Sequence, residues 1–266
     1  MHTNRISFST ALFVSMLISC SKILPVNEKA AIDFHTFHNR KMGASASEFL
    51  NDGVYKSLVV EIQYVAGFKP QQGTVDYLKN FLETYLRKPR GINILLKEIP
   101  SIEQNALNKD HVLTIENVYR TRYIQHDQIS MYILFTDGVH SGNKILGMAY
   151  GNTSAVVYGE AIRKYSNKGG RLTHQVLETA VLLHEIGHLL GLVNKGTPLR
   201  SEHVDFASND HCSNKSCLMY RSVEVKKLSS ILRQGNMPVL DSLCIEDLIA
   251  NGGKNTPDYE LYVKPF

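Results

Sequence analysis

The sequence lacks several features that would point to a function at once. It has no internal repeat, no low-complexity segment and no block of basic residues, and its formal net charge is only +4. Lysine and arginine are scattered along the 266 residues, which argues against a nucleic-acid-binding surface. The hydrophobic content of 43% and the charged content of 20% are ordinary for a globular protein, so we expect one domain of moderate size or two small ones.

The sequence also lacks an apolar run long enough to cross a bilayer comfortably. The apolar stretch at residues 6–18 is too short and is interrupted by serine and threonine, which is typical of a targeting segment. The residues Leu17 to Cys20 that end it resemble the bacterial lipoprotein signal. The resemblance implies removal of residues 1–19, a lipid on Cys20 as the only membrane contact and, because Ser21 follows, the outer membrane of the cell envelope. The protein would then be periplasmic or surface-exposed; the alternative is a plain secretory signal with an incidental cysteine.

Periodicity predicts a folded domain that begins near residue 56. Residues 20–55 are expected to be a tether, because proline, glycine and serine break any periodicity there, with a small helix starting at 48–50 as the one exception. Runs of β-branched and aromatic residues predict strands at 58–65, 92–99, 129–135, 146–150 and 154–158. Apolar residues at helical spacing predict helices at 75–86, 110–122, 173–190, 225–232 and 240–250. This order indicates a mixed α/β (α+β) fold, in which helices pack on a twisted mixed sheet and a small C-terminal subdomain follows.

The most informative stretch is HEIGHLLG, residues 184–191. In a helix, residues four apart lie on the same face, so His184 and His188 can direct their ring nitrogens at one cation. Imidazole suits zinc, and a catalytic zinc keeps three protein ligands and one open position. Glu185 can act beside the metal as the general base of a hydrolase. The alternative is an ordinary buried helix, but the apolar flanks and Gly191 at the end favour the catalytic interpretation.

The pattern HExxHxxG resembles the metzincin metallopeptidases. In that family the third zinc ligand is a histidine three residues after the glycine, whereas this chain has Asn194 there. Further on, four residues match the archaemetzincin signature position for position: His211, Cys212, Cys217 and Met219. The resemblance implies an archaemetzincin-like catalytic domain with an insertion, roughly 194–210, before the third ligand. This domain would span residues 56–266. Its N-terminal subdomain, 56–191, contains the catalytic helix. Its second part, 192–266, contains the insertion, the Met-turn and the C-terminal subdomain. The segment 192–198 is also similar to lipoprotein metallopeptidases of Bacteroidetes-type bacteria.

Two histidines compete for the third ligand position. The resemblance favours His211, while His203 is near enough in sequence to fold back over the metal; Asn194, a water molecule or no zinc at all are the remaining options. The resemblance also implies that Met219 packs under the metal as the Met-turn. Tyr220 is a further candidate, as a phenol donor to the scissile oxyanion, although the family places such a tyrosine two residues after the methionine.

The cysteines that follow the insertion leave two alternatives. Archaemetzincins use four cysteines to hold a second, structural zinc, the last two spaced CxxC, and here Cys244 is followed at that spacing by Asp247. One alternative is therefore a Cys3Asp zinc site that adds Cys212 and Cys217. The favoured alternative in an oxidising envelope is a disulfide, either Cys212 to Cys217 or one of these to Cys244.

Two function classes remain open. The first is a zinc-dependent endopeptidase, in which Glu185 is the general base and an edge strand from residues 146–158 aligns a peptide or protein substrate. The second is a catalytically weak or inactive surface lipoprotein that binds a protein or glycan on a metzincin-like scaffold. Glu185 favours the first, because a purely structural metal site needs no base beside it, and Asn194 favours the second. We expect a monomer in either case.

Overall fold

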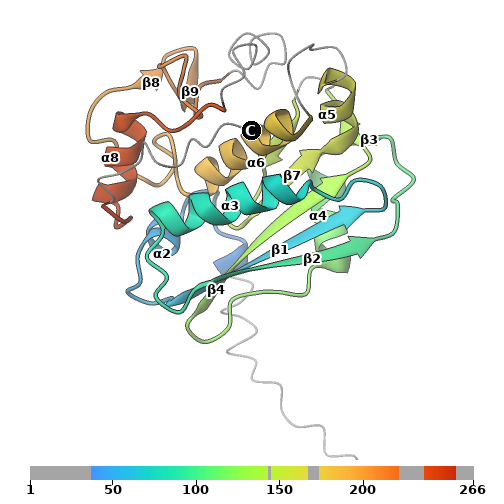
Figure 1. Cartoon of the computed structure of the whole chain (residues 1–266), viewed down its shortest axis with the longest axis horizontal. Coiled ribbons are helices and arrows are strands. Elements are labelled where there is room, and N and C mark those ends of the chain that lie inside the picture. Colours follow the sequence, from blue (N-terminus) through green and yellow to red (C-terminus); the bar gives the residue numbers. More distant parts are fainter. Residues whose placement is uncertain (1–36, 143–144, 167–173, 222–236, 256–266) are drawn as a thin grey trace, which may run out of the picture.

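The computed structural model describes residues 37–142, 145–166, 174–221 and 237–255 (Figure 1). The expected signal segment with Cys20 and the expected helix at 225–232 lie outside the described residues. Among the described residues, no helix has the length and apolar character needed to cross a membrane. The predicted fold class is confirmed, because helices pack on a central, mostly parallel sheet.

Five strands form the central sheet, in the order β2-β1-β4-β7-β6. Their bounds are β1 Ser57–Val65, β2 Ile92–Ile99, β4 Gln128–Thr136, β6 Gly147–Ala149 and β7 Ser154–Tyr158. Only β6, at one edge, runs antiparallel to its neighbour; the other pairs are parallel. All residues of β4 after the first are buried, because a parallel strand in the middle of a sheet is covered on both faces. Each strand lies within about two residues of its predicted position.

The helix that carries the HEIGHLLG stretch is the centre of the molecule. This helix, α6 (His174–Leu189), lies beside α3 (Gln72–Tyr85) across one face of the sheet, while α4 (Lys109–Tyr119) lies on the opposite face (Figure 1). Every residue of α6 from 176 to 189 is buried. A helix buried on all sides needs no polar face, which explains its nearly continuous apolar sequence. The small elements α5 (Gly159–Ser166), β3 (Ala106–Leu107) and β5 (Val139–His140) have no counterpart among the predictions.

The expected tether is wrong for residues 37–55. Within this segment α2 (Ala46–Leu50) contributes Phe49 to the hydrophobic core. The side-chain amide of Asn152 donates a hydrogen bond to the carbonyl oxygen of Phe37 at 2.8 Å, which ties the segment to the turn before β7. Short apolar groups between glycines and serines gave no periodicity, yet each of them packs on the folded domain.

The second half of the chain begins with a small hairpin inside the expected insertion. Its strands are β8 (Val204–Asp205) and β9 (Ser208–Cys212), and they pair in antiparallel fashion. The helix α8 (Ser242–Ala250) lies near this hairpin at one end of the molecule (Figure 1, upper left). This end of the fold brings the insertion close to the residues that follow the Met-turn.

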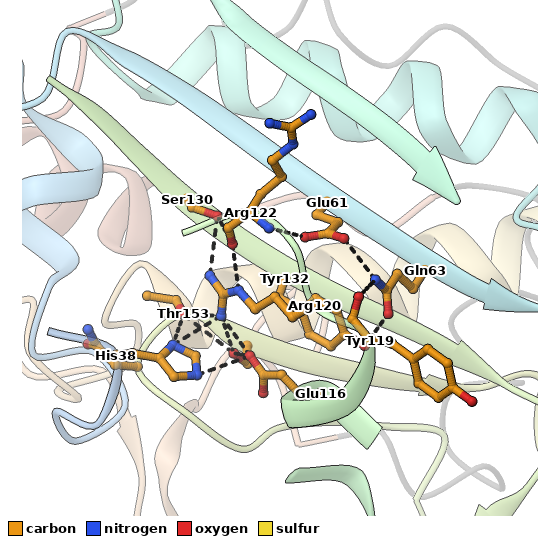
Figure 2. A network of polar contacts seen from close by, with 12 residues as sticks. His38, Glu61, Gln63, Glu116, Tyr119, Arg120, Arg122, Ser130, Tyr132 and Thr153 are labelled. Carbon is orange, nitrogen blue, oxygen red and sulfur yellow. Dashed lines mark hydrogen bonds and ion pairs between the residues drawn. The ribbon is translucent and has the colours of Figure 1, made fainter. Parts of the chain in front are cut away.

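A buried polar network lies where the end of α4 meets the sheet (Figure 2). Its centre is Arg120, directly after α4, whose guanidinium donates to Glu116 at 2.6 Å and to Thr153 at 2.9 Å. His38 joins the network through contacts with Arg120 at 3.0 Å and with Glu116 at 3.1 Å. The side chains of Arg120 and Glu116 are each only 1% exposed. The network therefore connects α4, the N-terminal segment and the start of β7 in the protein interior.

Candidate active site

Three imidazoles converge at the end of α6. His184 and His188 lie one turn apart on this helix, with ring centroids 4.8 Å apart, and His211 comes from β9. The His211 ring lies 5.3 Å from that of His184 and 5.2 Å from that of His188. One nitrogen from each ring can be chosen so that all three lie within 4.8 Å of one another. This is the spacing of a three-histidine metal site.

Hydrogen bonds on the outer side of each ring leave a nitrogen facing inward. The Nδ1 of His184 bonds to the carbonyl oxygen of Leu218 at 2.7 Å, and the Nδ1 of His188 bonds to that of Leu192 at 2.8 Å. A carbonyl accepts, so both Nδ1 atoms carry the proton and both Nε2 atoms have a free lone pair. The Nδ1 of His211 bonds to the hydroxyl of Ser208 at 2.8 Å. The backbone around the cluster thus orients the rings for one cation.

Burial keeps the three rings neutral. It lowers the pKa of His184 to about 4, with a further contribution from the neighbouring His211. Burial also lowers the pKa of His188 well below its usual value, and that of His211 in the same direction. Neutral imidazole is the form that binds a metal, so the donor set fits zinc at neutral pH without the loss of a proton.

Glu185 is held beside this cluster by the edge strand β6. Its Oε2 accepts a hydrogen bond from the backbone N–H of Ala149 at 2.7 Å. The strand comes this close because of Gly147, where a Cβ atom would lie 2.9 Å from Cγ of Glu185. Burial raises the pKa of Glu185 to about 8, and the hydrogen bond from Ala149 opposes that shift. A carboxyl group with a pKa near the working pH is suited to general acid–base chemistry.

The raised pKa of Glu185 predicts a pH-dependent stability difference in the metal-free protein. A carboxyl group with a folded pKa of about 8 and an unfolded pKa of 4.5 costs no stability below pH 4.5, and its cost grows until pH 8. We therefore expect chelator-treated Glu185→Gln protein to unfold at the same urea concentration as the wild type at pH 4.5. At pH 9 the variant should be more stable by a few kcal/mol. An equal difference at both pH values would contradict the assigned burial of the carboxylate.

The four side chains open onto a cavity of about 330 Å³. One wall consists of His184, Glu185, His188 and His211, and another of β6. Two further charged residues, Asp210 and Arg221, also line the cavity. Neither was predicted, because nothing in their sequence spacing relates them to the helix. The cavity leaves room for a substrate next to the imidazoles and the carboxylate.

Asn194, which stands at the third-ligand position of the metzincin pattern, lies away from the cavity. Gly191 ends the helix with a φ of +81°, as predicted for a C-terminal glycine. Asn194 follows at a φ of +55°, is exposed and does not line the cavity. The chain returns through the insertion, where Lys195 pairs with Asp210 at 3.2 Å directly before His211. The insertion therefore places His211, which is 17 positions after Asn194, beside the two helical histidines.

Met219 packs against Gly187, in the turn of α6 between the two helical histidines. A Cβ atom on Gly187 would meet the sulfur of Met219 at 2.3 Å, so only glycine fits between the ligand turn and this side chain. Met219 is fully buried. This position agrees with the packing role expected of the Met-turn. Tyr220, in contrast, does not line the cavity, and the next residue, Arg221, does.

The structure places His203 in a second cluster and not beside the first two histidines. It joins Cys212, Asp241 and Cys244 in a group whose ligand atoms lie within 4.8 Å of one another. As the alternative third ligand of the HExxH site, His203 is therefore ruled out by position. The insertion folds away from the cavity at this point and toward α8.

The two predictions for the cysteines also require correction. Cys212, Cys217 and Cys244 are free thiols, so no disulfide is formed among them in this structure. Asp247 is not positioned as a metal ligand, because its Oδ2 lies 2.8 Å from Nε2 of His203 and its Oδ1 accepts from the backbone N–H of Arg200. The carboxylate is already engaged by an imidazole that sequence spacing did not relate to it.

No family model matches the chain, and no curated protein matches it. Among solved structures, the chain is similar to archaemetzincin from Methanopyrus kandleri, at 17% sequence identity and a TM-score of 0.49. The match covers 75% of this chain and 96% of that chain.

Proposed function

We propose that this protein is a zinc-dependent endopeptidase of the metzincin type, with archaemetzincin-like features. The observation that carries the proposal is the convergence of His184, His188 and His211 next to the buried carboxylate of Glu185, all on one cavity. Three neutral imidazoles and a base are the parts of a hydrolytic zinc site, and a structural zinc site would be closed by a fourth ligand.

The residues around the cavity define how the chain would act on a peptide. Zinc held by the three imidazoles would supply Lewis acidity for the scissile carbonyl and for the attacking water. Glu185, fixed by Ala149, would take the proton from that water and pass it to the leaving amide nitrogen. The strand β6 forms the sheet edge beside the cavity, where an extended peptide can add as a further strand. A peptide or protein substrate fits this edge better than a compact small molecule.

The zinc content of variants tests the proposed ligand set. Replacing His211 with alanine removes one of three ligands, so this variant should bind about one zinc per chain fewer than the wild type and lose cleavage of unstructured peptides. Zinc is measured by elemental analysis after loading and dialysis, and cleavage by mass spectrometry of a peptide mixture.

The matched control for this test is His126→Asn. His126 is an exposed histidine at a φ of +53°, a conformation that asparagine tolerates. This control should retain zinc and activity. If the His211→Ala protein binds as much zinc as the wild type, the ligand assignment is wrong. Zinc binding without cleavage of any peptide would instead favour the alternative, a surface protein that binds a protein or glycan on this scaffold.

The proposal includes a place in the cell envelope. Its support is the sequence around Cys20, which predicts a lipid anchor as the only membrane contact, more consistent with the outer than with the inner membrane. Labelling with a fatty-acid analogue, compared between the wild type and Cys20→Ala, tests this part independently of catalysis. We propose a monomer as the active form.

A further inference from the structure

Arg221 is a charged residue of the cavity to which the proposed mechanism gives no role. It lines the same cavity of about 330 Å³ as His184, Glu185, His188 and His211. This volume is at the small end of the roughly 300–1,000 Å³ that ligand pockets occupy. A substrate group bound at Arg221 would therefore belong to the residues next to the bond that is cleaved.

The backbone that carries Arg221 is held against the proposed catalytic helix. Tyr220, directly before it, donates its N–H to the carbonyl oxygen of Cys217 at 3.0 Å and forms a β-bridge with Cys212. Met219, one residue earlier, is fully buried against α6. The side chain of Arg221 thus starts from a fixed point beside the cavity, which reduces the entropy lost when it binds a ligand.

Asp205, at the end of β8 in the insertion, orients the guanidinium. Its Oδ2 lies 2.9 Å from Nε of Arg221, and its Oδ1 accepts a hydrogen bond from the backbone N–H of Ala207 at 3.0 Å. The side chain of Asp205 is 13% exposed and that of Arg221 is 34% exposed. Because both oxygens of the carboxylate are engaged, it holds Nε of Arg221 in one direction. The insertion therefore shapes the cavity through Asp205 as well as through His211.

The remaining donors of Arg221 are available to a ligand. A guanidinium is charged at every pH of interest and carries five N–H donors. The contact with Asp205 engages Nε, and within the ranges that the structure describes no other acceptor contacts this side chain. The two terminal amino groups can therefore donate into the cavity. Paired N–H groups of this kind match the two oxygens of a carboxylate.

The rest of the cavity lining contains no competing partner for Arg221 among the described residues. Asp210 is the other charged group besides Glu185, and its carboxylate pairs with Lys195 at 3.2 Å. Apolar side chains, among them Ile145 and Met148, form another part of the lining. The three imidazoles are neutral, so Arg221 provides the cationic end of a cavity that is otherwise neutral or apolar.

We propose that Arg221 binds a carboxylate of the substrate beside the cleaved bond, with Asp205 as the residue that positions the guanidinium. The protein would then favour peptides that have an acidic side chain, or a free C-terminus, at that place. Carboxylates are the anions that unmodified peptides contain, so they are the chemical class that this guanidinium can select. The inference rests on the proposed function, but the binding of such a peptide can be measured without cleavage.

Peptide binding to Glu185→Gln protein, with and without zinc, tests the proposal. The probes are BODIPY-labelled alanine–glycine peptides with one glutamate at each position in turn, each beside a matched glutamine peptide, and with a free or an amidated C-terminus. Fluorescence anisotropy should show that one glutamate position, or the free C-terminus, binds about 10- to 100-fold more tightly than its neutral match. The two series identify the source of the carboxylate. Equal affinity of all charged and neutral pairs would overturn the proposal.

Two Arg221 variants and one control decide whether this guanidinium is responsible. Arg221→Met should bind the charged and neutral peptides equally, and Arg221→Lys should keep only part of the preference, because lysine retains the charge without the paired donors. Lysine can also keep an ion pair with Asp205, which protects the local fold. Arg90→Met removes an arginine that pairs with Asp127 outside the cavity, and it should keep the full preference. An undiminished preference in both Arg221 variants would overturn the assignment.

Cleavage assays with Glu185 intact separate this proposal from the proposed function. Arg221→Met should raise KM for the preferred peptide and leave kcat/KM for its neutral match unchanged. A carboxylate preference that depends on Arg221, without cleavage of any peptide, would contradict the proposed function and leave this proposal standing. If Arg221→Met lowers kcat by the same factor for charged and neutral peptides, the guanidinium acts on the reacting carbonyl, and the proposal is wrong.

Discussion

Replacement of Glu185 with glutamine is expected to reduce peptide cleavage by about 10³-fold while zinc remains bound. The amide keeps the size of the side chain and can still accept the hydrogen bond from Ala149, so the cavity should retain its shape. The amide has no basic site for the proton of the attacking water. Loss of the carboxylate therefore removes the general base and the general acid together. Initial rates on a fluorogenic unstructured peptide, measured beside elemental analysis, check both halves of the prediction.

Glu178→Gln is the matched control, because Glu178 is a second buried glutamate on α6. Its carboxylate accepts from the backbone N–H of Gln71 at 2.9 Å and from Thr74 at 2.7 Å, and it does not line the cavity. This variant should lose some stability and keep its rate per folded molecule. Cleavage by Glu185→Gln at the wild-type rate would exclude Glu185 as the base.

Replacement of Arg120 with methionine is expected to lower the free energy of unfolding by about 3–5 kcal/mol. The change leaves the buried carboxylate of Glu116 without its cation, and one oxygen of that carboxylate already has no hydrogen-bond partner among the described residues. Burial alone would raise the pKa of Glu116, but the hydrogen bond from His38 and the charge of Arg120 outweigh burial and lower it to about 2. Urea denaturation at pH 7 measures the loss.

Two comparisons separate the buried ion pair from a general effect of the substitution. Arg90→Met breaks the exposed pair of Arg90 with Asp127 and should cost less than about 1 kcal/mol. Adding Glu116→Leu to Arg120→Met removes the unpaired charge, and the double variant should recover a large part of the lost stability. If the single and double variants are equally unstable, the uncompensated carboxylate is not the cause.

The sequence by itself determined the local features of this protein. Runs of β-branched and aromatic residues placed the five sheet strands, and apolar residues at a spacing of 3.6 placed the helices around them, because composition and spacing report how a short segment is buried. The spacing of four between His184 and His188 placed both on one face of α6, and Gly191 marked the end of that helix. These features depend on neighbours within one or two turns, so a single segment is enough to predict them.

The tertiary structure alone decided which distant residues meet. It brought His211 to the helical histidines, moved His203 to the cysteines and turned Asp247 from an expected ligand into the partner of His203. It also placed Phe37 and Phe49 in the core, although their segment has no periodicity. The physical reason is that the ligands of one site need only be close in space, whatever the length of the loops between them. The insertion before His211 changes the sequence spacing between the HExxH helix and the third ligand, and that spacing is what usually identifies the ligand.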